Sequence, residues 1–300
     1  MWRPRLSASA FQKPSLETMI DYQEFSSILN RHIFGEEKKD LLERIAKKPE
    51  RFVGLFRPTK PESKILQNIF QSREIRFGDA MEEIAKSILV SLGYEILDSQ
   101  ITPELRVDLY FCRSKSFYMV EQKIRDDHDS TKRIGQFVNF REKFEFLFSR
   151  HSSKLEDAAM WFVDPSLMKN RKYYLREMDK LKSETCCKNI FLFYGSEFFN
   201  HLGISNLWDD LLGWLLVWRE DLPTMPEIDF DADSNDSFEQ IRSLEIKYWR
   251  KIIKEDDLWT QGIMGILFRT GETLQRMVDY LKEIGEEKLS QNLNRRINKL

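Results

Sequence analysis

Three charged side chains lie in a pattern that suits chemistry on a phosphate. Asp108 lies within the apolar run ELRVDLYFC, and Glu121 and Lys123 lie within the next run, SFYMVEQKI. Successive side chains of a strand point to opposite faces, so Glu121 and Lys123 share a face. A carboxylate in an apolar strand is costly unless it is paired or binds a metal. A hairpin that turns near Ser114 would bring Asp108 close to the other two.

The chemistry expected from this cluster is hydrolysis of a phosphodiester. Two carboxylates that converge in a partly buried site repel each other, and a hard divalent cation cancels that repulsion. Mg²⁺ suits such a site because it accepts one or two carboxylates together with waters and substrate phosphates. Lys123 would orient or deprotonate a water, or stabilise the charge of the transition state. The alternative is structural: Asp108 would face water at a sheet edge, and Glu121 and Lys123 would form a solvated ion pair.

The elements around these residues favour the active-site interpretation. Helical spacing of apolar residues predicts helices within 20–50 and on both sides of Gly78, the second of which ends at Gly93. The elements expected after Gly93 are three strands in an antiparallel meander, a helix, a strand, a helix and a strand, at 94–100, 104–112, 116–124, 131–150, 158–164, 166–182 and 189–195. This order predicts an α/β fold, with a central mixed β-sheet in an αβββαβ core flanked by helices. Additional helical regions are expected at both ends of the chain, with an acidic stretch at 219–237 that is either a solvated linker or an exposed loop.

Residues 76–140 resemble the PD-(D/E)xK nuclease superfamily, in its type II restriction endonuclease branch. The matching residues are Asp108 and the run Glu121-Gln122-Lys123, on strands that follow a helix containing GDAMEE. Val107 stands where the superfamily has a proline before the first aspartate. The C-terminal segment SLEIKYWRKIIK is similar to a segment of HindIII-type enzymes.

The resemblance implies cleavage of double-stranded DNA with Mg²⁺ as the cofactor. The metal ligands that it implies are Asp108, Glu121 and Gln122. The catalytic residues that it implies are Asp108, Glu121, Lys123 and an acidic residue of the preceding helix. Glu82 is the best match for that acidic residue, and the neighbouring Glu83 is the alternative.

Five polar residues are candidates for DNA binding. Lys132 and Arg133 begin the helix after the catalytic strand, and Gln136 lies one turn further along. A helix N-terminus also favours anions, so this stretch is expected to hold phosphates and to set register without reading sequence. The alternative is an ordinary charged helix start. Arg73 and Arg76, near Gly78, are the other two candidates.

Composition sets limits on the class of protein. Charged residues make up 32% of the 300 residues but leave a net charge of only −2, which excludes DNA binding by bulk positive charge and leaves a local basic groove open. No apolar run is long enough to cross a membrane, and the first residues lack the apolar segment of a secretory signal, so we expect the fold to begin near Met19. The three cysteines lack the spacing of a disulfide framework or a zinc site, which favours a cytoplasmic location.

The resemblance implies a type II restriction endonuclease, which we expect to be organised in three regions. The expected regions are an N-terminal extension with helices, a nuclease core, and a C-terminal helical region for dimerisation or DNA clasping, at 1–74, 75–200 and 201–300. A homodimer is expected because a palindromic target favours two-fold symmetry in the protein. A cognate DNA methyltransferase is expected in the same system, without a stable complex.

Two other functions are alternatives to restriction. The first is a DNA-processing nuclease of the RecB or Cas4 kind, but Phe140 stands where the QxxxY motif of those enzymes has tyrosine. The second is a catalytically silent DNA-binding protein of the same fold. The intact set of Asp108, Glu121 and Lys123 argues against it, because a degenerate site would tolerate losses.

Overall fold

The computed structural model describes residues 19–300 apart from positions 55, 57, 186, 188 and 299. The expected N-terminal extension before Met19 lies outside the described residues. The chain forms two compact units, each built from segments far apart in the sequence. In the described part, unit 1 comprises 19–28 and 78–221, and unit 2 comprises 29–77 and 222–300. The division into three regions at 74 and 200 stays a prediction.

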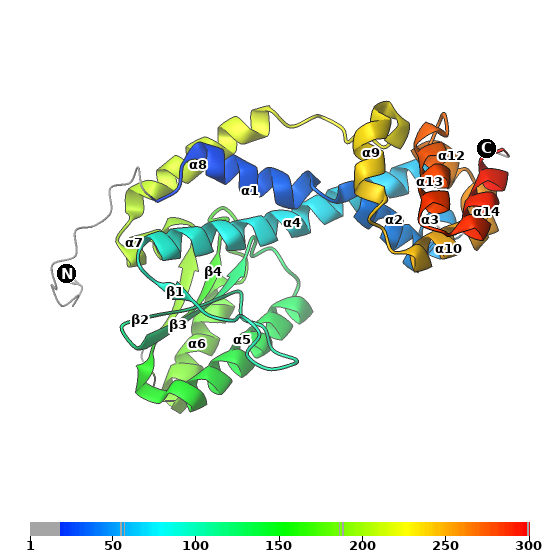
Figure 1. Ribbon diagram of the computed structural model, residues 1–300. Helices are drawn as coiled ribbons and strands as arrows, with labels where there is room; N and C mark the ends of the chain where they lie inside the picture. The colour runs from blue at the N-terminus through cyan, green and yellow to red at the C-terminus, as the bar shows by residue number, and fades with distance from the viewer. Residues whose placement is uncertain (1–18, 55, 57, 186, 188, 299) are drawn as a thin grey trace. The chain divides into compact units, whose positions relative to one another are not determined.

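Unit 1 contains a five-stranded mixed sheet in the order β1-β2-β3-β4-β5 (Figure 1). The strands are β1 (Glu95–Ile96), β2 (Leu109–Arg113), β3 (Ser116–Lys123), β4 (Leu155–Phe162) and β5 (Ile190–Tyr194). β1, β2 and β3 pair antiparallel, whereas β3, β4 and β5 pair parallel. The predicted central mixed sheet and the antiparallel meander are therefore confirmed.

Helices cover both faces of this sheet. The helices of unit 1 are the first half of α1 (Tyr22–Phe34), the second half of α4 (Pro61–Ser91), α5 (Ser130–His151), α6 (Arg171–Thr185), α7 (Ser196–Leu202) and α8 (Ser205–Glu220). Buried side chains of α5 and α6, such as Phe140 and Tyr174, share a core with Met119 and Met160 of the sheet. On the other face, Trp161 packs against Phe198 of α7 with its ring tilted and 4.7 Å between ring centroids. The result is an α/β unit with its sheet between two helical layers (Figure 1).

The helix before the sheet differs from its prediction. α4 runs without interruption through Gly78, where two helices were expected. One glycine costs a helix interior only about 1 kcal/mol, so buried apolar residues on both sides outweigh it. The predicted end at Gly93 is confirmed: α4 stops at Ser91, and Gly93 adopts a φ of 81°. Such a left-handed residue is the usual way to close a helix.

The first two strands are shorter than predicted, and Asp108 lies one residue before β2 rather than inside it. The side-chain amide of Gln100 donates to the carbonyl oxygens of Thr102 and Pro103, at 2.6 and 3.3 Å. These local hydrogen bonds favour turns over a strand ladder. The turn expected near Ser114 is confirmed, because Ser114 and Lys115 join β2 to β3 with positive φ values of 50° and 72°. Positive φ at both positions is what a two-residue hairpin loop requires.

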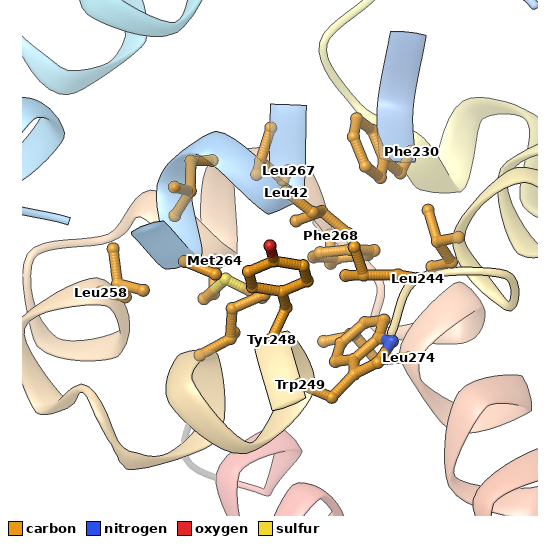
Figure 2. Packing of buried hydrophobic residues seen from close by; sticks show 14 of the residues in the cluster. Leu42, Phe230, Leu244, Tyr248, Trp249, Leu258, Met264, Leu267, Phe268 and Leu274 are labelled. Carbon is orange, nitrogen blue, oxygen red and sulfur yellow. The ribbon is translucent and has the colours of Figure 1, made fainter. Parts of the chain in front are cut away.

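Unit 2 is built from helices among its described residues. They are the end of α1, α2 (Glu37–Lys47), α3 (Glu50–Val53), the first half of α4, η3 (Phe230–Asp233), α9 (Ser234–Ile241), α10 (Ile246–Lys254), α11 (Asp256–Thr260), α12 (Ile263–Leu267), α13 (Glu272–Glu283) and α14 (Glu287–Ile297). Figure 2 shows their shared core, in which Leu42 of α2 packs with Trp249 of α10 and Phe268. Among all helices of the described chain, none has both the length and the apolar character to cross a membrane.

The acidic stretch 219–237 is only partly a solvated linker, which corrects the prediction. Phe230 is buried in the core of unit 2 (Figure 2). The Asp231 carboxylate accepts hydrogen bonds from three backbone N–H groups at 2.8 Å, those of Thr270, Gly271 and Thr273. Burial acts to raise the pKa of Asp231, but these bonds outweigh it and the pKa is lowered. Asp231 therefore joins this stretch to the segment at the start of α13 and helps to stabilise unit 2.

The aromatic residues of α10 also face the core rather than solvent. Tyr248 and Trp249 are buried, whereas Lys247, Arg250 and Lys251 on the same helix are exposed. Lys247 pairs with Glu245 at 2.6 Å and Arg250 with Glu286 at 2.8 Å, so both of these cations already have carboxylate partners.

We expect Trp249→Ala to destabilise unit 2 by about 3–5 kcal/mol, the usual cost of truncating a fully buried aromatic residue. Trp249 is completely buried (Figure 2), and its indole N–H has no acceptor among the described residues. Trp249→Phe should therefore cost much less. Denaturant unfolding followed by circular dichroism measures both, with Ile284→Ala as a control at a site that is 45% exposed. Equal losses for Trp249→Ala and Ile284→Ala would contradict this packing.

Candidate active site

The β2–β3 hairpin brings the predicted catalytic residues together. Leu109 pairs with Val120 in the antiparallel register. Asp108, which precedes Leu109, therefore lies opposite Glu121, which follows Val120. Asp108 is thereby placed next to Glu121 and Lys123. The backbone N–H of Gln122 donates to Asp108 Oδ2 at 2.8 Å, which fixes the carboxylate against β3.

The Lys123 ammonium is the centre of the cluster. Its Nζ donates to Asp108 Oδ2 at 2.9 Å, to Glu121 Oε1 at 2.7 Å and to the Gln122 carbonyl oxygen at 2.8 Å. These three oxygens belong to the three residues predicted to bind the metal. A single cationic group thus already lies within reach of the whole predicted ligand set.

Burial is uneven across the cluster. The Glu121 side chain is 4% exposed, whereas those of Asp108 and Lys123 are 20% and 28% exposed. The cluster is therefore closed at Glu121 and open to solvent at Asp108 and Lys123. Burial acts to lower the pKa of Lys123, but the Glu121 and Asp108 carboxylates outweigh burial and raise it above its usual value.

A second lysine, which the sequence reasoning missed, contacts Glu121 from α5. Lys143 Nζ donates to Glu121 Oε2 at 2.7 Å, and both side chains are almost completely buried. Two ammonium groups therefore balance the two carboxylates. The sequence did carry a signal, because Lys143 falls on the buried stripe of α5 between Phe140 and Phe144.

The donor set fits Mg²⁺. Carboxylate and carbonyl oxygens are the hard ligands that this ion prefers, and it needs only one or two carboxylates beside water and substrate phosphate. Asp108, Glu121 and the Gln122 carbonyl supply that set. Within the described residues, no group of three or more His, Cys, Asp or Glu side chains offers an all-protein metal cage. The side chain of Gln122 is engaged elsewhere, because its Nε2 donates to the Gly78 carbonyl at 3.2 Å.

Glu82 lies on α4 with partners of its own. Its Oε1 accepts from Lys86 Nζ at 2.5 Å and from Arg106 at 3.2 Å. Arg106 stands two residues before Asp108, so Glu82 is tied to the segment that enters the site. Among the described hydrogen bonds, none joins Glu82 directly to Asp108, Glu121 or Lys123. A catalytic role for Glu82 stays a prediction.

The start of α5 is fixed by a buried network beyond the catalytic strand. Asp126 is fully buried and accepts from the backbone N–H and side-chain amide of Asn170 and from the Tyr194 hydroxyl, each at 2.8 Å. Arg133 Nη1 donates in turn to Asn170 Oδ1 at 3.1 Å. The exit of β3 is therefore joined to the start of α6 and to β5.

The three DNA-binding candidates on α5 have different surroundings. The Lys132 side chain is exposed, and Arg133 stacks over the Tyr173 ring at 4.7 Å. Gln136 Oε1 accepts from the Tyr174 hydroxyl at 2.7 Å. Lys132 is thus the most accessible of the three, while Arg133 and Gln136 are held in place by α6.

Arg73 and Arg76 lie in unit 2 and are engaged with carboxylates there. Arg73 donates to both oxygens of Glu37, at 2.7 and 2.8 Å, a bidentate pair. Arg76 pairs with Asp40 and also donates to the Ile33 carbonyl at 2.9 Å. Their contact with DNA stays a prediction, and these ion pairs are an alternative role for both arginines.

Comparison with known families decides the class of protein. The model of the type II restriction endonuclease family HinfI matches residues 21–105 and 95–216. The chain belongs to the HinfI family of type II restriction endonucleases. No curated protein and no solved structure shows a significant match.

The candidate site lies within the part of the chain that matches the HinfI family, because the matched stretches contain Asp108, Glu121, Lys123 and Lys143. The family is one of nucleases that act on DNA. The segment SLEIKYWRKIIK lies outside the matched residues, and its resemblance to HindIII-type enzymes stays a prediction.

Proposed function

We propose that this HinfI family member is a PD-(D/E)xK enzyme that hydrolyses phosphodiester bonds at a specific site of double-stranded DNA with Mg²⁺. The observation that carries the proposal is the convergence of Asp108 Oδ2, Glu121 Oε1 and the Gln122 carbonyl oxygen on Lys123 Nζ. Oxygens that converge on one cationic position in a site open to solvent are suited to hold a metal ion against a substrate phosphate.

The residues of the chain have distinct roles in this proposal. Asp108, Glu121 and the Gln122 carbonyl would hold Mg²⁺. Mg²⁺ would supply Lewis-acid polarisation of the phosphate and a water of lowered pKa. Lys123 would stabilise the negative charge that develops on the phosphate. Glu82 would orient Arg106 beside Asp108.

The biological setting is part of the same proposal. A cytoplasmic homodimer would place one site on each strand of a palindromic target. A cognate methyltransferase would protect the host copies of that target without a stable complex. The HinfI family match favours this setting over a RecB- or Cas4-like processing nuclease.

Digestion of plasmid DNA tests the function. The purified chain is incubated with plasmid in Mg²⁺, in Ca²⁺ and in EDTA, and the products are sequenced at their ends. Discrete fragments with one shared end sequence, formed in Mg²⁺ alone, are expected. A ladder that grows from free ends would indicate an exonuclease, and intact plasmid in Mg²⁺ would indicate a silent DNA-binding protein.

Removal of Lys132 and Arg133 is expected to weaken DNA binding without changing sequence preference. Each phosphate contact contributes about 0.9 to the slope of log affinity against log salt, so loss of four contacts in a dimer should make the slope shallower by about 3–4. Binding of cognate and unrelated duplexes in Ca²⁺ is measured at several salt concentrations. Lys180→Ala, on the exposed side of α6, is the matched control.

Two results would contradict phosphate binding at the start of α5. A collapsed ratio of cognate to unrelated affinity with little change of slope would indicate base reading instead. An unchanged slope and affinity would indicate an ordinary solvated helix start. Lys132→Ala alone separates the exposed lysine from Arg133, whose loss also removes a partner of Asn170.

A further inference from the structure

Lys143 is a buried cation whose ammonium contacts Glu121. It projects from the inner face of α5, and its neighbours on that face are the fully buried Phe140, Phe144 and Leu147. The ammonium donates to Glu121 Oε2 at 2.7 Å and has no other hydrogen-bond acceptor among the described residues. Taking an ammonium out of water is unfavourable, and a well-packed apolar residue at such a position is often as stable or more so. Packing alone therefore does not account for a lysine here.

The two oxygens of Glu121 have separate partners. Oε1 accepts from Lys123 Nζ, which also donates to Asp108 Oδ2 and to the Gln122 carbonyl oxygen, whereas Oε2 accepts from Lys143 Nζ. Two charge-assisted hydrogen bonds at 2.7 Å, one to each oxygen, hold the Glu121 carboxylate between Lys143 and Lys123. Oε1 is thereby held toward Lys123 Nζ, the point on which the oxygens of the proposed metal site converge.

We propose that Lys143 is a positioning residue that holds Oε2 of Glu121, so that Oε1 alone is presented to the metal. The inference rests on the proposed function, because it assigns Glu121 as a metal ligand. Groups that orient metal ligands from behind typically change metal affinity or activity about 10–100-fold when they are removed.

Lys143→Met tests the proposal, because methionine keeps the length and apolar stem of lysine without its charge. Binding of Mn²⁺ to the protein without DNA is measured by calorimetry, and the Mg²⁺ dependence of single-turnover cleavage is measured beside it. The expected result is a metal affinity reduced about 10–100-fold, with most of the cleavage rate recovered at saturating Mg²⁺. An affinity that is unchanged or increased would overturn the proposal.

Phe144→Leu is the matched control, because it perturbs the same buried face of α5 without touching Glu121. It should lower the thermal midpoint and leave the Mg²⁺ dependence as in the wild type. If Lys143→Met does not fold, Lys143→Gln takes its place, since it keeps a donor without the charge, and a loss of Mn²⁺ affinity is again expected. If neither variant folds, Lys143 forms a structural ion pair and the proposal is wrong.

The wild-type chain separates this inference from the proposed function. If the wild type neither binds Mn²⁺ nor cleaves DNA, the metal-dependent nuclease fails and the role of Lys143 fails with it. If the wild type does both and Lys143→Met matches it, only the role of Lys143 is wrong.

Discussion

Asp108→Asn is expected to lower the rate of DNA cleavage by at least about 10³-fold. The substitution removes one carboxylate from the proposed metal site, where the metal supplies several kcal/mol of transition-state stabilisation and each 1.4 kcal/mol is a factor of ten. The fold should survive, because the asparagine carbonyl can still accept the Gln122 N–H that now bonds Asp108 Oδ2. The Asp108 side chain is also 20% exposed, so little buried charge is left unpaired. Single-turnover cleavage in Mg²⁺ and the thermal midpoint are measured together.

Asp157→Asn is the matched control for Asp108→Asn. Asp157 lies in β4 of the same sheet, its side chain is 21% exposed, and it pairs with His201 at 2.8 Å. It should cleave DNA as the wild type does. Full activity of Asp108→Asn would exclude Asp108 as a metal ligand, and unfolding of Asp108→Asn alone would favour a structural ion pair.

Glu121→Gln should also abolish cleavage, but with a larger loss of stability. Glu121 is buried between Lys123 and Lys143, so its neutralisation leaves two ammonium groups without a carboxylate between them. Breaking a buried pair in this way typically costs about 3–5 kcal/mol. Asp108→Asn is for that reason the cleaner test of the metal site.

Lys123→Met should slow cleavage about 10²–10⁴-fold and leave binding of duplex DNA in Ca²⁺ near the wild-type value. That range is typical for loss of a positioned group that acts on charge or protons in the transition state. Metal affinity should not fall, because Lys123 Nζ contacts the same three oxygens that the metal would use. The expected effect on metal binding is thus opposite to that of Lys143→Met, although both variants remove a positive charge beside Glu121.

Lys182→Met controls for the loss of a partly exposed lysine elsewhere in unit 1, since its side chain is 34% exposed and paired with Asp179. It should match the wild type in both assays. If Lys123→Met loses DNA binding with no separate defect in single-turnover cleavage, Lys123 is only a phosphate contact.

The sequence by itself determined the features that depend on near neighbours in the chain. Apolar residues at a period of two or 3.6 predicted the strands and helices of unit 1, and the two-residue loop at Ser114 and Lys115 set the hairpin register that places Asp108 beside Glu121. Such patterns are local, because strand faces, helix faces and tight turns are set within a few residues. For this reason the mixed sheet and the convergence of three catalytic candidates were predictable.

Only the tertiary structure decided which charges meet across elements. Lys143 reaches Glu121 from 22 positions away, and Arg73 meets Glu37 from 36 positions away. The sequence shows each of these residues as one charge among many, and its periodicity says which face is buried but not which side chain lies opposite. Pairing depends on how a helix is docked on its neighbours. Lys143 therefore became a buried partner of Glu121, and Arg73 formed a bidentate ion pair with Glu37. Lys132 remained an exposed cation.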